Sequence, residues 1–167
     1  MIDAIAQSLR TITHPRFYET ERGFQGEFLV SLRRVLPDIG LPGDAIVEQE
    51  YQKRVLDHGI KIRPDIIIHV PTPSGSDRRR DNFVAFELKL AARTKDALED
   101  FGNLDEIIAA LDYPLGIFVN IASAHTYADI YGGRFPDRIH CFAVQLAEGG
   151  VRVRHACFDG TGFVERD

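Results

Sequence analysis

Two carboxylates and an amine are spaced so that a β-sheet would bring them together. Asp65 lies upstream of Glu87 in the chain, and Lys89 follows Glu87 after one intervening residue. Side chains two residues apart on a strand leave the same face, and a neighbouring strand would place Asp65 beside Glu87 and Lys89. The two acids would repel each other. A hard divalent cation held by carboxylate oxygens and waters relieves such repulsion, so the first hypothesis is a metal site for phosphate chemistry.

In a plainer interpretation, the same residues simply lie on the solvent-facing side of a strand. Residues 82–90 alternate between apolar and polar positions, and Glu87 and Lys89 both fall on the polar side. A Glu-x-Lys tripeptide is common by chance and carries little weight alone. Whether these residues form a metal site or only the solvent-facing side of a strand therefore depends on the elements around them.

The N-terminal half of the chain favours one helix, two strands and a loop. Apolar residues at helical spacing predict a helix over residues 15–36, which Pro37 ends. Residues 45–55 are β-like, although less apolar than a central strand. Residues 60–70 contain three consecutive isoleucines and are typical of a strand. The composition of residues 71–81, rich in Pro, Ser and Arg, predicts a loop.

The remaining residues predict alternating strand and helix, followed by a hairpin. The expected elements are a half-buried strand over 82–90, a helix from Thr94 that ends before Pro114, an interior strand over 115–121, and hairpin strands over 139–146 and 151–158. The two cysteines fall on opposite strands of this hairpin. If Leu146 faces Val151, then Cys141 faces Ala156, and the side chains of Cys141 and Cys157 point to opposite faces. We therefore predict free thiols. Neither the cysteines nor the six histidines have the spacing of a zinc or redox motif.

This order of elements around Asp65, Glu87 and Lys89 resembles the PD-(D/E)XK nuclease superfamily. The resemblance covers roughly residues 15–121. It implies an α/β fold, with a restriction-endonuclease-like mixed central sheet flanked by helices in the order helix, three strands, helix, strand. Residues 122–167, with the β-hairpin, would form a C-terminal extension. We expect residues 1–167 to form a single nuclease-like domain.

The resemblance also implies a role for each residue of the motif. Asp65 and Glu87 would bind Mg²⁺, for which Mn²⁺ would substitute, and the backbone carbonyl of Leu88 would be a further ligand. Lys89 would assist the attacking water. The chemistry implied is hydrolysis of phosphodiesters in DNA by a metal-dependent endonuclease.

A glutamate on the first helix often completes the site in that superfamily. We assign this position to Glu27, because it is flanked by Gly26 and Phe28 near the inward stripe of the predicted helix. Glu19 and Glu21 lie close to the predicted helix start, and we therefore pass them over.

Basic residues near the motif are candidates for substrate binding. The net charge of −5 argues against a protein that coats nucleic acid by bulk electrostatics, but residues 61–95 hold eight basic and four acidic side chains. Arg78, Arg79 and Arg80 in the predicted loop would contact phosphates, although charge runs in loops are often merely solvated. Arg93 and Lys95 would hold a phosphodiester at the start of the second helix.

The rival hypothesis is a non-catalytic module that keeps this fold and binds nucleic acid or a protein, since fold alone does not confer activity. The expected partner is DNA rather than RNA, with a homodimer or a separate recognition subunit left open. The apolar runs are all far shorter than a membrane-spanning helix requires, so no such helix is expected. The absence of an apolar leader and of paired cysteine motifs favours a cytoplasmic protein.

Overall fold

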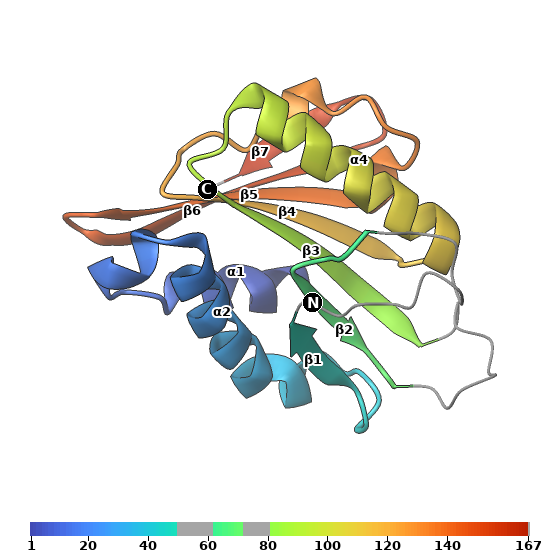
Figure 1. Ribbon diagram of the computed structural model, residues 1–167, viewed down its shortest axis with the longest axis horizontal. Coiled ribbons are helices and arrows are strands. Elements are labelled where there is room, and N and C mark those ends of the chain that lie inside the picture. The colour runs from blue at the N-terminus through green and yellow to red at the C-terminus, as the bar shows by residue number, and fades with distance from the viewer. Residues whose placement is uncertain (50–61, 72–80, 167) are drawn as a thin grey trace.

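A seven-stranded mixed sheet forms the centre of the protein, and helices cover both of its faces (Figure 1). The computed structural model describes residues 1–49, 62–71 and 81–166. The strands follow chain order across the sheet: β1 (Ile46–Gln49), β2 (Ile66–His69), β3 (Asn82–Leu90), β4 (Leu115–Ile121), β5 (Ile139–Ala147), β6 (Gly150–Phe158) and β7 (Phe163–Arg166). The β3–β4 and β4–β5 pairs are parallel, and the other neighbouring pairs are antiparallel.

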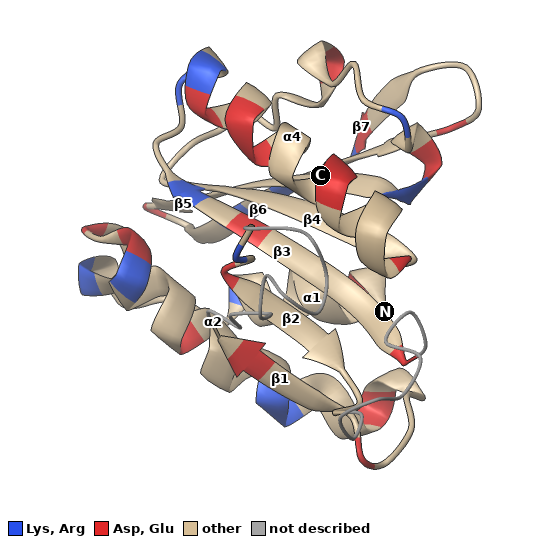
Figure 2. Cartoon of the chain, turned by 45° about the vertical axis from the view of Figure 1, so that its right-hand side comes forward, with Lys and Arg blue, Asp and Glu red and all other residues tan. Residues whose placement is uncertain are grey.

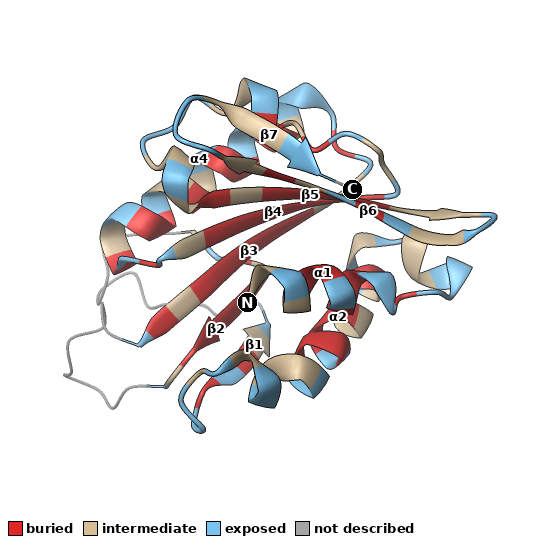
Figure 3. Ribbon diagram, turned by 180° about the vertical axis from the view of Figure 1, so that it is seen from behind, coloured by how far each residue is buried: buried red, intermediate tan, exposed pale blue. Residues whose placement is uncertain are grey.

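Strand alternation separates two hydrophobic cores. On one face, α1 (Ile2–Arg10) and α2 (Glu21–Val35) pack against a layer that includes Phe86 and Leu88 of β3. On the other face, α4 (Thr94–Leu111) packs against a layer that includes Ala85. Figure 3 shows buried residues along the central strands. Because Ala85 faces α4, the next two odd-numbered residues of β3, Glu87 and Lys89, face α4 as well.

The helix predicted over residues 15–36 consists of two elements. A 3-10 helix covers Pro15–Tyr18, and α2 begins only at Glu21. Thr20 caps α2, since its hydroxyl oxygen accepts a hydrogen bond from the backbone N–H of Gly23 at 3.1 Å. Glu21 therefore stands in the first turn of a helix that starts later than predicted.

Several predicted elements are confirmed, and two elements of the structure were not predicted. The strands over residues 82–90 and 115–121, the helix from Thr94 and the hairpin are present as β3, β4, α4 and β5–β6. The second predicted strand is shorter than expected, since β2 covers only Ile66–His69. Of the β-like stretch over 45–55, β1 covers Ile46–Gln49, and residues 50–55 lie outside the described part of the chain. Helix α1 and strand β7 were not predicted.

The residues predicted as a C-terminal extension continue the central sheet. Strand β5 pairs in parallel with β4, with Gly116 opposite Ile139. Parallel pairing joins strands whose connection runs through a crossover, so the local pattern of the hairpin does not reveal it. Strands β6 and β7 then extend the same sheet.

The hairpin has the predicted register. Leu146 is opposite Val151 and Cys141 is opposite Ala156, and both cysteines are free thiols as predicted. Among the helices in the described part of the chain, none has both the length and the apolar character needed to cross a membrane.

Candidate active site

The pairing of β2 with β3 brings Asp65 to Glu87. Ile66 is opposite Phe86, and the backbone N–H of Asp65 donates to the carbonyl of Phe86 at 3.1 Å, so the register continues with Asp65 opposite Glu87. The two carboxyl groups share a hydrogen bond. Oδ2 of Asp65 also accepts from the backbone N–H of Leu88 at 2.7 Å. The structure therefore brings together the two acids that the sequence spacing selected.

Lys89 lies among carboxylates from three parts of the fold. Its Nζ is 3.9 Å from Oδ2 of Asp100 on α4 and 3.9 Å from Oε2 of Glu21 on α2. The negative charges of Asp65 and Glu87 also act to raise the pKa of Lys89. We call Glu21, Asp65, Glu87 and Asp100 the carboxylate cluster. Figure 2 shows the charged residues of β3 beside the acidic residues of α4.

Glu21, and not Glu27, is the α2 glutamate that reaches the site. Oε2 of Glu21 accepts from the backbone N–H of Leu90 at 3.2 Å, and Nε2 of Gln25 donates to the carbonyl of Asp65 at 2.8 Å. Glu21 and Gln25 are four residues apart and share one helix face. Glu27 lies about 200° around the helix from Gln25, which points it away from the strands. In the described part of the chain it contacts none of the cluster through a hydrogen bond or ion pair.

Asp100 is a site residue that the sequence analysis missed. It lies on α4 between Ala97 and Phe101, and it is only 5% exposed. Ala97, Phe101 and Leu104 form the buried stripe of α4, so a carboxylate at position 100 faces the sheet. An acid inside an apolar helical stripe was the sequence signal for this residue.

The cluster holds more negative charge than its surroundings satisfy. Oε1 of Glu87 and Oδ2 of Asp100 are buried, and no hydrogen-bond donor among the described residues reaches them. Burial, with the charges of Asp65 and Asp100, raises the pKa of Glu87 well above its usual value. Burial also raises the pKa of Asp100 to about 7, although Lys89 opposes this. Such unsatisfied buried oxygens demand a proton or a cation.

Lys89 is held in its charged form. Burial alone would lower the pKa of its amine, but Asp100, Glu21, Asp65 and Glu87 together outweigh burial and raise it. One ammonium cannot balance the cluster once all four carboxyl groups are ionised, however. An all-oxygen donor set with excess negative charge fits a hard divalent ion such as Mg²⁺, which binds through one or two carboxylates and keeps several waters.

Replacing Asp100 with asparagine should stabilise the metal-free protein at high pH. The pKa of Asp100 is about 7 in the folded state, against 3.8 for the free side chain. Between these values the folded state binds more protons than the unfolded state, so stability falls as pH rises, by at most ~4 kcal/mol. Urea denaturation in EDTA from pH 5 to 8 should show this fall in the wild type and a smaller one in Asp100→Asn. The exposed Glu106→Gln on α4 is the control, and identical pH profiles for wild type and Asp100→Asn would contradict the assignment.

The predicted substrate-binding residues are only partly described. Arg78, Arg79 and Arg80 lie outside the described residues. Arg93 is 83% exposed at the start of α4, and its Nε is 3.1 Å from Oδ2 of Asp96 in an N-terminal capping arrangement. Its guanidinium therefore already has an acidic partner.

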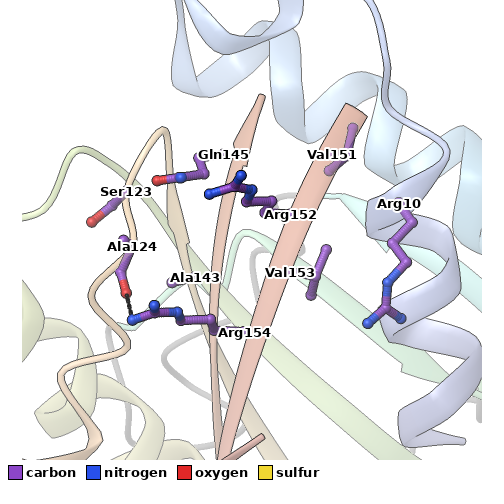
Figure 4. Close-up of a pocket in the computed structure, with 9 residues that line it drawn as sticks. All are labelled: Arg10, Ser123, Ala124, Ala143, Gln145, Val151, Arg152, Val153 and Arg154. Carbon is purple, nitrogen blue, oxygen red and sulfur yellow. Dashed lines mark hydrogen bonds between the residues drawn. The ribbon is translucent and has the colours of Figure 1, made fainter. Parts of the chain in front are cut away.

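Two further basic side chains, Arg152 and Arg154, lie on β6, at the end of the sheet that also bears Lys89. A pocket of about 410 Å³ is lined there by Arg10, Arg152 and Arg154, and its described lining includes no acidic residue. In Figure 4, Arg152 and Arg154 point to one side of β6, where Nη1 of Arg154 donates to the carbonyl of Ala124 at 3.4 Å. Arg10 of α1 lies on the other side of the strand.

Arg154 shares a row of the sheet with Lys89. Lys89 is opposite Asn120, Asn120 is opposite Ala143, and Ala143 is opposite Arg154. Residues in such a row face the same side of the sheet, here the α4 side. Three strand spacings separate the backbones of the two residues, which corresponds to about 14 Å. The sequence analysis missed this arrangement because it depends on the long-range pairing of β4 with β5.

Comparison with known proteins gives a likeness of fold. No family model and no curated protein matches the sequence. Among solved structures, NucC from P. aeruginosa in its cAAA-bound form is similar, with a TM-score of 0.55 and 13% identity, over 98% of this chain and 79% of that one. This likeness concerns the fold alone, and it agrees with the mixed seven-stranded α/β architecture of the chain.

Proposed function

We propose that the protein is a metal-dependent nuclease that hydrolyses phosphodiester bonds in DNA at the carboxylate cluster. The observation that carries the proposal is the pair of buried carboxylate oxygens on Glu87 and Asp100 that no hydrogen-bond donor among the described residues reaches, next to Asp65 and Lys89. Buried charges are costly unless they are paired or bind a metal. A divalent ion held by Asp65 and Glu87 would satisfy Oε1 of Glu87 and lower the repulsion at Asp100, and it would lie beside the charged Lys89.

The donor set assigns a role to each residue. Asp65 and Glu87 would hold Mg²⁺ or Mn²⁺ with the backbone carbonyl of Leu88. When bound, the ion would lower the pKa of a coordinated water and offset charge on the phosphoryl oxygens. Lys89, held protonated, would donate a hydrogen bond to the attacking oxygen or to a phosphoryl oxygen as negative charge develops. Glu21 and Asp100 would keep the ammonium of Lys89 in place.

A catalytic site accounts for the burial pattern better than the rival binding module does. A module that binds phosphates needs exposed cations, whereas Glu87 and Asp100 are each only 5% exposed and repel phosphate. Without an ion, their ionised forms destabilise the fold, as the raised pKa values of both groups indicate. Strongly perturbed carboxyl groups gathered at one point are typical of functional sites.

Arg152 and Arg154 are suited to bind the DNA backbone beyond the cleavage point. The distance of about 14 Å from Lys89 to Arg154 across the sheet equals about four nucleotides along duplex DNA, at ~3.4 Å each. Both arginines are exposed, and the row that joins Arg154 to Lys89 lies on the side of the sheet that bears the cluster. Arg78, Arg79 and Arg80, with Arg93 and Lys95, remain further candidates from the sequence.

The double variant Arg152→Ala/Arg154→Ala should weaken DNA binding without slowing cleavage at saturating DNA. Each phosphate contact releases counterions, so the slope of log affinity against log salt should decrease by up to about 2. Fluorescence anisotropy in Ca²⁺ at several salt concentrations measures the slope. Arg16→Ala/Arg34→Ala, which removes two exposed charges from the part of the chain around α2, is the control. Equal slopes for the wild type and the β6 variant would exclude these arginines from the interface.

The proposed activity is tested by cleavage of end-labelled DNA. Linear duplex DNA, single-stranded DNA and RNA of one sequence are incubated with the protein in Mg²⁺, in Mn²⁺ and in EDTA. We expect cleavage of DNA in either metal and none in EDTA. Binding of DNA without cleavage in both metals would favour the non-catalytic module.

A further inference from the structure

Two histidines and a cysteine converge on the sheet face opposite the carboxylate cluster. His140 of β5 is directly opposite Cys157 of β6, and His155 precedes Cys157 by two residues. All three side chains therefore leave one face of the β5–β6 ladder. This is the face of α1, because Phe142, opposite His155, belongs to the α1 and α2 core. One nitrogen of each imidazole and the sulfur of Cys157 lie within 4.8 Å of one another.

The two imidazoles are aligned and already joined through their nitrogens. Nδ1 of His140 is 2.8 Å from Nε2 of His155, and the ring planes differ by only 4°. His155 stacks on Phe142 with ring centroids 4.6 Å apart, which fixes its plane. Burial lowers the pKa of His140 to about 4, and burial with Arg166 lowers the pKa of His155. Histidine binds metals through its neutral imidazole form.

A cavity of about 370 Å³ opens onto these three side chains. Its lining includes His140, His155 and Cys157 from the sheet and Asp3 from the first turn of α1. Arg10 and Arg166 also line it. The thiolate of Cys157 and the carboxylate of Asp3 would offset the charge of a divalent ion here.

We propose that His140, His155 and Cys157 form a transition-metal site that binds Zn²⁺. Two imidazoles and a thiolate make a borderline-soft donor set, which prefers Zn²⁺ to Mg²⁺. Tetrahedral bonds of about 2.0–2.1 Å to nitrogen and 2.3 Å to sulfur set the ligand atoms roughly 3.3–3.6 Å apart. The two nitrogens must therefore separate by about half an ångström, and the ion replaces the proton that they share. The fourth position faces the cavity near Asp3.

This site is independent of the proposed nuclease activity. It lies on the other face of the sheet, and its ligands differ in chemistry from the oxygen donors of the carboxylate cluster. The spacing along the chain hides it, since His140 and His155 belong to different strands and are far apart in the sequence. Only the register of the hairpin brings the three residues together. By joining β5 and β6 beneath α1, the ion would stabilise that side of the fold.

Titration of the EDTA-treated protein with Co²⁺ tests the site. Cobalt substitutes for zinc, and a thiolate ligand produces a charge-transfer band in the near ultraviolet that carboxylates do not give. We expect one equivalent of Co²⁺ to produce the band, and one equivalent of Zn²⁺ to remove it and to raise the melting temperature.

The variants separate this site from the other thiol and from the carboxylate cluster. Cys157→Ser and His155→Ala should each abolish the band, with folding checked by circular dichroism. Cys141→Ser, which removes the other thiol from the opposite face, should retain it, and so should Glu87→Gln. A wild-type protein without the band, or a band that survives in Cys157→Ser, would overturn the proposal. Neither result bears on DNA cleavage, which is measured separately in Mg²⁺.

Discussion

Glu87→Gln should abolish DNA cleavage while leaving the metal-free protein at least as stable as the wild type. Glu87 is 5% exposed, its Oε1 has no donor among the described residues, and burial raises its pKa. The amide has almost the same shape and no charge, so it relieves repulsion within the cluster. The same change removes a proposed metal ligand. Turnover should therefore decrease by more than the roughly 10²–10³-fold that the loss of one charge-stabilising contact causes.

The measurement is single-turnover cleavage in Mg²⁺, combined with urea denaturation in EDTA. Glu27→Gln is the matched control, because this glutamate lies on α2 but points away from the strands. It should cleave like the wild type, whereas Glu21→Gln should be impaired. Cleavage by Glu87→Gln at the wild-type rate would show that the reaction takes place elsewhere.

Lys89→Met should lower turnover by roughly 10²–10³-fold, the range for loss of a single preorganised electrostatic contact, and should leave Mg²⁺ binding intact. Lys89 lies 3.9 Å from Oδ2 of Asp100 and is not itself a candidate metal ligand. Methionine keeps the length and the apolar stem of the side chain and removes only the ammonium. The loss should therefore appear in kcat, while KM for DNA changes little.

Isothermal titration with Mg²⁺ and single-turnover rates at saturating DNA separate these two effects. A variant that binds Mg²⁺ and DNA but cleaves slowly identifies Lys89 as a catalytic residue. Wild-type turnover in Lys89→Met would show that the lysine only balances the charge of the cluster.

The convergence of Asp65, Glu87 and Lys89 was predictable because it depends on short-range regularities. Alternation along β3 fixes the face that Glu87 and Lys89 share, and antiparallel pairing with β2 adds Asp65. Strands β3 and β4 and helix α4 were also predictable from period and composition. Each of these features is set by residues within one element or its nearest neighbour.

Glu27 was predicted as the helix glutamate because Glu21 was passed over as too close to the predicted helix start. In the structure Thr20 caps α2, Glu21 stands in the first turn, and Oε2 of Glu21 accepts a hydrogen bond from the backbone N–H of Leu90. Asp100 was missed for another reason. Its approach to Lys89 depends on how α4 packs against β3, which is a tertiary contact.

The sites on the C-terminal strands could be recognised only from the full order and pairing of the strands. Arg154 aligns with Lys89 only through the parallel pairing of β4 with β5, and the histidine–cysteine group forms only in the register of β5 with β6. Spacing along the chain reveals neither, because the contacting residues come from separate strands. Parallel pairing in particular has no local sequence signature.

The most direct test of the central claim is the position of a bound ion in a crystal of the protein soaked in Mn²⁺. Anomalous difference density identifies Mn²⁺ without reference to activity. We expect an anomalous peak within coordination distance of Asp65 and Glu87, about 2.1–2.3 Å from a carboxylate oxygen of each. We expect this peak to be absent in Glu87→Gln. Well-ordered density for both side chains with no anomalous peak between them, at a Mn²⁺ concentration that supports cleavage, would contradict the account.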